Sequence, residues 1–123
     1  MEIYSFKKEV GKKITHFNSN FIMSRIINTN SQAHIGCMNL EADGVIGYHQ
    51  ATVPQLLLIV EGEGVVRGKE DKFITVQQGD AVFWQSEEWH ETKSSNGLTA
   101  IVIESKDLNP SDFMPKRETI SNT

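Results

Sequence analysis

Short runs of bulky and β-branched residues recur along this chain at roughly eight- to twelve-residue intervals, with polar clusters between them. Runs with the composition of strands cover residues 21–27, 33–40, 55–60, 65–68, 72–76, 81–85 and 98–104. No long segment repeats its apolar residues at the spacing that an amphipathic helix requires. The pattern therefore predicts an all-β sandwich or barrel.

Polar stretches that contain glycine separate these runs and predict where the chain turns. Segments 41–44, 61–64 and 77–80 are expected turns. Residues 65–68 and 72–76 should form a hairpin, and Asn96-Gly97 should close a second one ahead of residues 98–104. Pro54 has no N–H to give to a ladder, so it should mark a strand start or an edge.

The same pattern divides the chain into three stretches within one domain, which suits 123 residues. Residues 1–32 are expected to form an N-terminal arm with short strands, and residues 33–107 the barrel. Residues 108–123 form a polar tail with two of the three prolines. We expect this tail to be an ordered cover at its start and disordered at its end.

Composition narrows the class of protein. The net charge of −4 argues against a nucleic-acid partner, because phosphate contacts need a basic face. The longest apolar run, 56–60, is too short to span a bilayer, and the N-terminus lacks the apolar core of a signal peptide. The single cysteine, Cys37, rules out an intramolecular disulfide and fits a reducing compartment. We expect a cytoplasmic protein with no membrane partner.

Two segments place a histidine where a strand is expected: GVIGYHQATVPQLLLIVEG at 44–62 and GDAVFWQSEEWH at 79–90. Together they resemble the paired motifs of the cupin superfamily. The first motif, a glycine, His-x-His, a glutamate and a glycine, is matched by Gly44, His49, Ala51, Gln55 and Gly62. The second, a glycine, a proline, a glycine, a histidine and often an asparagine, is matched by Gly79, Gln85, Glu87, His90 and Ser94.

The resemblance implies a double-stranded β-helix (cupin, or jelly-roll) barrel, often dimeric, with a pocket at one mouth. In metal-bearing cupins the motif residues hold a transition metal ion. This chain departs from the ligand set at Ala51 and Gln55, where histidine and glutamate would stand. Three candidate ligands remain for a divalent metal such as Zn, Fe, Ni or Mn: His49, Gln55 and His90.

The chemistry of these three residues leaves two alternatives open. Neutral imidazole is a good ligand for transition metals, but an amide oxygen attracts a cation less than a carboxylate does. Such a set would bind metal weakly while leaving open positions for a substrate. Alternatively, the barrel holds no metal, and Gln55 hydrogen-bonds one of the two histidines. Five glutamates could supply a carboxylate but are expected at the surface: Glu41, Glu87, Glu88, Glu91 and Glu104.

Alternation along the strands extends the predicted pocket. Ala51 shares a face with His49, and Thr92 lies beside His90 on its strand. The resemblance places Leu57 and Ile59 deeper on the wall that begins at Gln55. Cys37 could line the pocket and Trp89 could close its mouth, although core packing is an alternative for each. His34, by the same alternation, should face away from Cys37 and lie at the surface.

Three functions follow as hypotheses. The first is a metal-dependent enzyme acting on a small organic molecule, with dioxygenase, isomerase or lyase chemistry. The second is a metal-free enzyme of the epimerase type, in which His49 or His90 is the general base. The third is a ligand-binding or sensing module without turnover. A homodimer is expected in each case, because residues 1–27 can pair with a second copy and cover a sheet edge.

Overall fold

In the computed structural model, which describes residues 1–117, all regular structure is β-strand apart from three single-turn 3-10 helices. This confirms the all-β prediction. The short helices are Lys8–Val10, His16–Asn18 and Pro110–Asp112. The strands are β1 (Glu2–Ser5), β2 (Lys12–Ile14), β3 (Phe21–Met23), β4 (Ala33–Leu40), β5 (Gly44–Gln50), β6 (Gln55–Arg67), β7 (Ile74–Gln77), β8 (Asp80–Trp84), β9 (Trp89–Ser94) and β10 (Leu98–Ser105).

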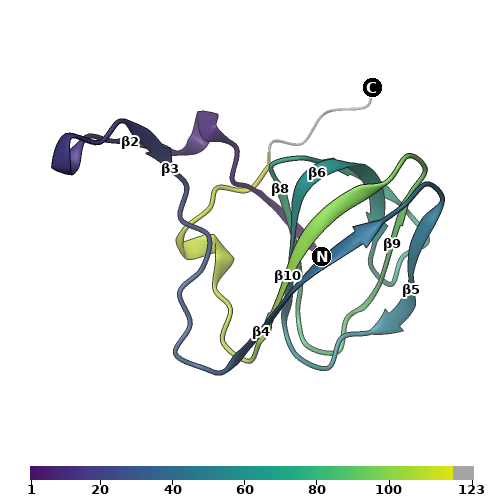
Figure 1. The fold of residues 1–123 in the computed structure, drawn as a ribbon. Coiled ribbons are helices and arrows are strands. Elements are labelled where there is room, and N and C mark those ends of the chain that lie inside the picture. Colours follow the sequence, from purple (N-terminus) through teal and green to yellow (C-terminus); the bar gives the residue numbers. More distant parts are fainter. Residues whose placement is uncertain (118–123) are drawn as a thin grey trace.

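Two antiparallel walls face each other and share the long strand β6 (Figure 1). The larger wall has the order β1-β8-β6-β10-β4, and the smaller one contains β5, β9 and β7 with the far end of β6. Residues 55–58 of β6 pair with β8, whereas residues 63–66 pair with β7. The prediction of a turn at 61–64 is therefore wrong. The chain bends there and continues, with Gly62 in the left-handed region at φ +82°.

The other turn predictions met different outcomes. β6 and β7 form the predicted hairpin, with Val65 opposite Thr75. The turn at Asn96-Gly97 is present, with Gly97 at φ +102°, but it does not close a hairpin. β9 pairs with β5 and β6, and β10 pairs with β4 and β6, so this turn carries the chain from one wall to the other.

Two apolar clusters lie on opposite faces of the large wall, because successive residues of β6 point to opposite sides. The cluster between the walls contains Leu57, Ile59, Val66, Val76, Val82, Trp84, Leu98, Ala100 and Val102. The cluster on the outer face contains Tyr4, Leu56, Leu58, Ala81, Phe83, Ile103, Leu108 and Met114. A strand residue that belongs to the first cluster faces the barrel interior, and one that belongs to the second faces outward. The residues between them on each strand can be assigned by alternation.

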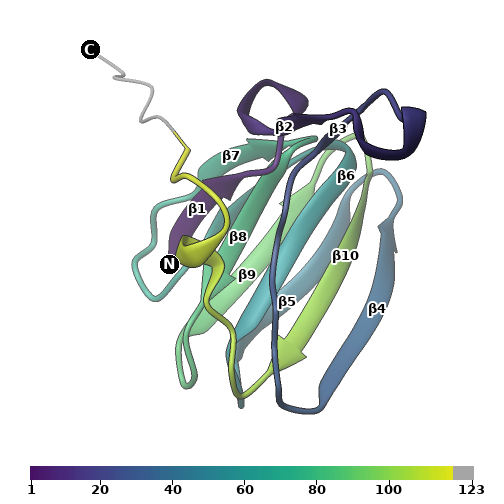
Figure 2. The same ribbon diagram turned by 90° about the vertical axis from the view of Figure 1, so that its left-hand side faces the viewer.

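The two ends of the described chain lie outside the barrel interior. β1 extends the large wall beside β8, and the β2–β3 hairpin projects away from the barrel (Figure 1). Residues 108–117 pack on the outer face, where Tyr4 bridges to Lys116 (Figure 2). The expected cover is thus on the back of the wall, and the end of the tail, 118–123, lies outside the described residues.

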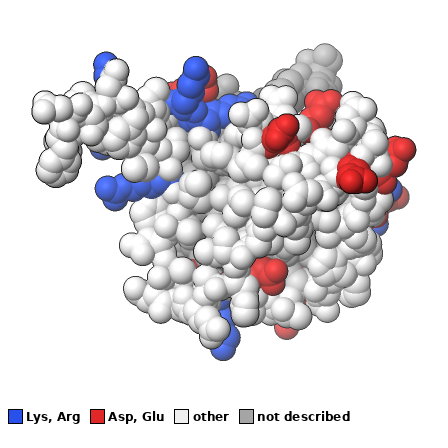
Figure 3. Space-filling model, in the orientation of Figure 1, with Lys and Arg blue, Asp and Glu red and all other residues white. Residues whose placement is uncertain are grey.

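Charge is unevenly distributed on the face seen in Figure 3. Acidic side chains gather towards the edge formed by the small wall, lysine and arginine lie mainly towards the projecting arm, and much of the surface between them is uncharged. None of the helices in residues 1–117 is both long enough and apolar enough to cross a membrane.

Candidate functional site

The two motif histidines meet at one end of the small wall. His49 of β5 lies directly opposite His90 of β9, and their Nε2 atoms are 3.1 Å apart. His90 is only 2% exposed, whereas His49 is exposed to solvent. The predicted convergence of these two imidazoles is therefore present, with one ring inside the barrel and one at its opening.

The backbone fixes the orientation of His49. The register between β5 and β9 shifts between Ile46 and His49, and this irregularity brings His49 Nδ1 within 2.7 Å of the Gly47 carbonyl. A carbonyl only accepts, so Nδ1 carries the proton and Nε2 keeps its lone pair. That lone pair is directed at His90 Nε2, which donates the hydrogen bond between the rings.

His90 is held neutral by its surroundings. Its pKa is lowered from 6.5 to about 4, mainly by burial and also by the neighbouring His49, while Glu88 acts in the opposite direction. Glu88 lies in the loop before β9 and accepts a 2.8 Å ion pair from the Met1 ammonium group. His90 can therefore offer a neutral imidazole across the physiological pH range.

Gln55 faces inward on the large wall, as Leu57 and Ile59 do two and four residues further along β6. It lies opposite Trp84 of β8, whose ring packs edge-on against His90 at 4.5 Å between centroids. Gln55 is 7% exposed, so most of its side chain is enclosed between the walls. The Trp84 Nε1 atom is buried without a hydrogen-bond partner in residues 1–117.

The remaining inward predictions concern Ala51 and Thr92. Ala51 is buried, donates its N–H to Glu88 O and accepts from Glu87 N, so it ties together the two loops at this end. Thr92 is 2% exposed and lies opposite Val66 of the inner cluster. Both residues lie on the barrel interior side, and their role in binding stays a prediction.

Two predicted pocket residues are placed elsewhere. Cys37 alternates with Met38, which packs on the inner cluster, so the thiol is on the outer face and exposed; the prediction for Cys37 is wrong. Trp89 alternates with His90, so it also points outward, stacked on Tyr48 at 5.2 Å between centroids. The prediction that Trp89 closes the mouth is wrong for the same reason.

Sequence reasoning missed one inward position, Glu104, whereas His34 is exposed and faces away from Cys37, as predicted. The two residues lie opposite each other on β4 and β10, and Glu104 is also opposite Gln55. His34 has the same parity as Met38 and Leu40, which pack on the inner cluster. His34 therefore lies on the inner side of β4 at its exposed end, and placing Glu104 beside it needed the strand pairing itself.

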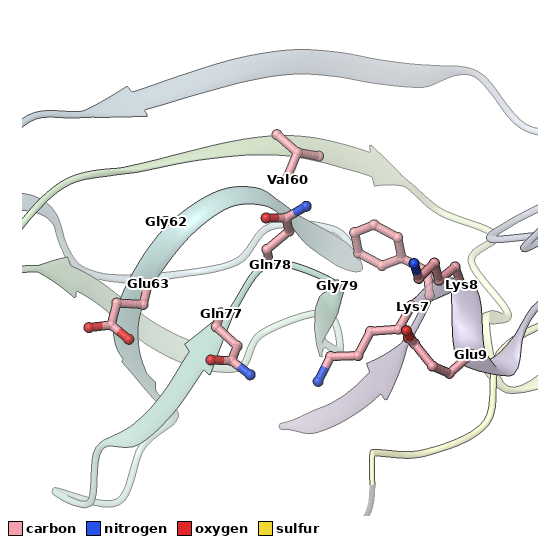
Figure 4. Close-up of a pocket in the computed structure, with 10 residues that line it drawn as sticks. Lys7, Lys8, Glu9, Val60, Gly62, Glu63, Gln77, Gln78 and Gly79 are labelled. Carbon is pink, nitrogen blue, oxygen red and sulfur yellow. The ribbon is translucent and has the colours of Figure 1, made fainter.

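Three surface cavities lie away from this cluster. The largest, about 860 Å³, lies between the start of the arm and the turn before β8, with Lys7 extended over Gly79 (Figure 4). The other two, about 360 and 400 Å³, are beside Asp43 and beside Met23. None of the three is lined by His49, Gln55 or His90.

A metal at this end would depend on a mixed ligand set. Within residues 1–117 no group of three or more His, Cys, Asp or Glu side chains is placed to share one ion. The histidine pair would therefore need a different third donor, and the Gln55 amide, which faces inward from the large wall, is of the right chemical type.

Comparisons with known proteins support the architecture. No family model matches the chain, and no curated protein does. Among solved structures, it is similar to a predicted oxalate decarboxylase from Thermotoga maritima (23% identity, TM-score 0.54, 58% of this chain and 64% of that one). It thus spans less than two thirds of that protein.

Two further structures are similar over more of their length. One is a cupin superfamily protein from Desulfitobacterium hafniense (16% identity, TM-score 0.58, 69% of this chain and 77% of that one). The other is an RmlC-like cupin from Shewanella frigidimarina (19% identity, TM-score 0.57, 64% and 70%). With two walls of antiparallel strands and these neighbours, the chain has the double-stranded β-helix fold of the cupin superfamily.

Proposed function

We propose that this cupin binds a divalent transition metal at the barrel mouth through His49, His90 and Gln55, and a small organic molecule beside it. The observation that carries the proposal is the 3.1 Å separation of the two Nε2 atoms. Metal–nitrogen bonds of about 2.0–2.1 Å leave two imidazole nitrogens on one ion roughly 3 Å apart. The pair is therefore spaced for a shared ion as well as for a hydrogen bond.

The groups around the pair support the same reading. Metal-binding histidines commonly donate their second N–H to a backbone carbonyl, as His49 Nδ1 does to Gly47. Binding also needs neutral imidazole, and the lowered pKa of His90 provides it. Three protein donors would leave coordination positions open for oxygen atoms of a ligand. Because all three donors are neutral, they would not neutralise the charge of the ion.

A bound metal would supply Lewis-acid chemistry to an oxygen of that ligand. The protein would hold the donors, exclude water with the inner apolar cluster, and orient the ligand with the remaining polar groups of the mouth. These roles fit dioxygenase, isomerase and lyase chemistry equally well. We propose the three reaction classes together and do not choose one of them.

One observation favours a second candidate, a metal-free acid–base site. The hydrogen bond between His49 and His90 is complete without an ion, and it gives a path along which a proton can move between an exposed and a buried ring. In this reading either ring would exchange a proton with the ligand, or the site would bind the ligand without turnover.

Metal titration of protein purified without a histidine tag separates these candidates. We expect about one equivalent of Zn²⁺, Ni²⁺, Mn²⁺ or Fe²⁺ to bind, and at least about tenfold weaker binding in His49→Ala and in His90→Ala. His16→Ala, in the projecting arm, is the matched control and should bind like the unmodified chain. Retention of full affinity in His49→Ala, or no metal bound by the unmodified chain, would overturn the metal site.

A further inference from the structure

Four side chains form a row across the mouth end of the large wall. Trp84 of β8 is opposite Gln55 of β6, Gln55 is opposite Glu104 of β10, and Glu104 is opposite His34 of β4. Residues directly opposite one another on paired strands share a face and have neighbouring Cβ atoms. The row therefore continues the site of His49 and His90, because Trp84 packs on His90.

The two core clusters show that this row faces into the barrel. Ile103 belongs to the outer cluster and Val102 to the inner one, so Glu104 has the inward parity of Val102. No register shift interrupts the pairing of β10 from Ala100 to Glu104. Glu104 is partly buried and forms no ion pair within residues 1–117.

The charge inside the mouth is one-sided. The barrel strands of the described chain contain two cationic side chains, Arg67 and Lys93, and both are on the outer face: Arg67 lies over Tyr48, and Lys93 near Phe73. At this end the inward titratable groups of the strands are the imidazoles of His34, His49 and His90 and the carboxylate of Glu104. In the adjoining loop Glu88 acts on His90, and its charge is offset by the Met1 ammonium group. An anionic ligand would meet the Glu104 carboxylate without a lysine or arginine to offset it.

An unpartnered indole N–H in the same row as Glu104 indicates that the row meets a polar ligand. Buried polar groups nearly always have a hydrogen-bond partner, yet the Trp84 N–H has none in residues 1–117. An indole N–H needs an acceptor and a carboxylate needs a donor. A hydroxyl group satisfies both, and an ammonium group satisfies the carboxylate.

We propose that Glu104 is a ligand-binding residue that sets the ligand class, selecting neutral or cationic compounds with hydroxyl or amino groups over carboxylates and other anions. This rests on the proposed function in one respect: the ligand occupies the same mouth as the histidine pair. It goes beyond that function by assigning the large wall, from Trp84 to His34, as the part of the site that recognises the ligand.

A matched series of three probes tests the selection: propanolamine, propanediol and hydroxypropionate differ mainly in carrying an amine, a hydroxyl or a carboxylate. Fluorescence titrations use metal-free Trp89→Phe protein, in which Trp84 is the remaining tryptophan. We expect propanolamine to bind at least about tenfold more tightly than hydroxypropionate, with propanediol between them. Glu104→Gln should reduce that ratio to near one.

Glu61→Gln is the matched control, because Glu61 is an exposed carboxylate on the same strand as Gln55, and it should leave the ratio unchanged. The proposal is overturned if hydroxypropionate binds as tightly as propanolamine, if Glu104→Gln keeps the ratio, or if none of the probes binds. Metal titration of the same variants keeps the two ideas separate. Loss of metal binding in His49→Ala together with an unchanged ratio in Glu104→Gln would remove this inference alone.

Discussion

His49 accepts a hydrogen bond from His90 at one ring nitrogen and donates one to the Gly47 carbonyl from the other. This arrangement assigns the proton on each ring: Nδ1 of His49 and Nε2 of His90. An ion placed between the rings would find His49 ready to bind and would require His90 to move or lose the proton of Nε2. In the proposed metal site, the buried ring rather than the exposed one would therefore limit binding of the ion.

Restoring a carboxylate at position 55 should strengthen metal binding. Gln55→Glu adds a negative charge on the inner face, and Coulomb attraction to a divalent ion is strong where water is partly excluded. We expect binding to tighten by at least about tenfold, which corresponds to roughly 1.4 kcal/mol, in calorimetric titration with Zn²⁺ or Ni²⁺. Gln78→Glu, at an exposed position, is the control. Equal affinities in the two variants would show that position 55 does not contact the ion.

Lowering the pH should destabilise the metal-free protein because of His90. Above pH 6.5 this ring is neutral in both folded and unfolded states, so it contributes no pH dependence. Between 6.5 and about 4 the unfolded chain takes up a proton that the folded ring does not, and folding stability falls as the pH falls. The loss has an upper limit of about 3 kcal/mol.

Urea denaturation with EDTA present, repeated across this pH window, measures that loss. His90→Gln should be less stable overall but should lose most of the slope, and His34→Gln should keep it because His34 is exposed. An identical slope in His90→Gln and the unmodified chain would contradict the assignment.

The tail should stabilise the fold through Arg117. This guanidinium donates to the Thr75 carbonyl at 2.8 Å and to Oδ2 of the almost fully buried Asp80 at 3.0 Å. Arg117→Gln weakens both contacts and leaves the carboxylate less well compensated, so we expect a loss of about 2 kcal/mol in the free energy of unfolding. Lys116→Gln removes the neighbouring, exposed ion pair with Glu2 and should cost much less than Arg117→Gln. Equal costs would contradict this account.

We propose that the β2–β3 hairpin mediates a homodimer. A two-stranded hairpin is only marginally stable alone, and this one exposes apolar side chains, including Phe17 at 98%, Ile22 and Met23. Light scattering should give twice the 13.8 kDa of one chain, and Ile22→Glu should give the single mass. Val45→Glu, an exposed apolar position on β5, should remain dimeric. A monomeric unmodified chain would refute the proposal.

Local patterns in the sequence were sufficient for the strands and for the histidine pair. β4 matches the predicted run 33–40, and the spacing from Gly79 to His90 correctly placed the second imidazole against the first. The sequence patterns did not show which strands pair, so features that depend on the pairing could not be predicted. The segment 61–64 has the composition of a turn, yet pairing with both walls keeps it within one strand.

The errors in the pocket have one physical origin. Facing direction alternates with every residue, so a candidate is placed correctly only when its parity is anchored to a core residue. Cys37 and Trp89 were judged by residue type and were assigned to the wrong face. Glu104 was assigned to the surface because glutamate is usually there, and only the register with Gln55 brings it inward.

The continuity of β6 has a mechanical consequence. Its first residue, Gln55, is at the mouth, and its far half holds the small wall together, so neither wall can detach without breaking a ladder that belongs to the other. On heating, the two walls should then unfold together in one transition rather than one wall before the other. A ligand bound at the mouth should therefore reduce backbone mobility along β6 as far as the bend at Gly62.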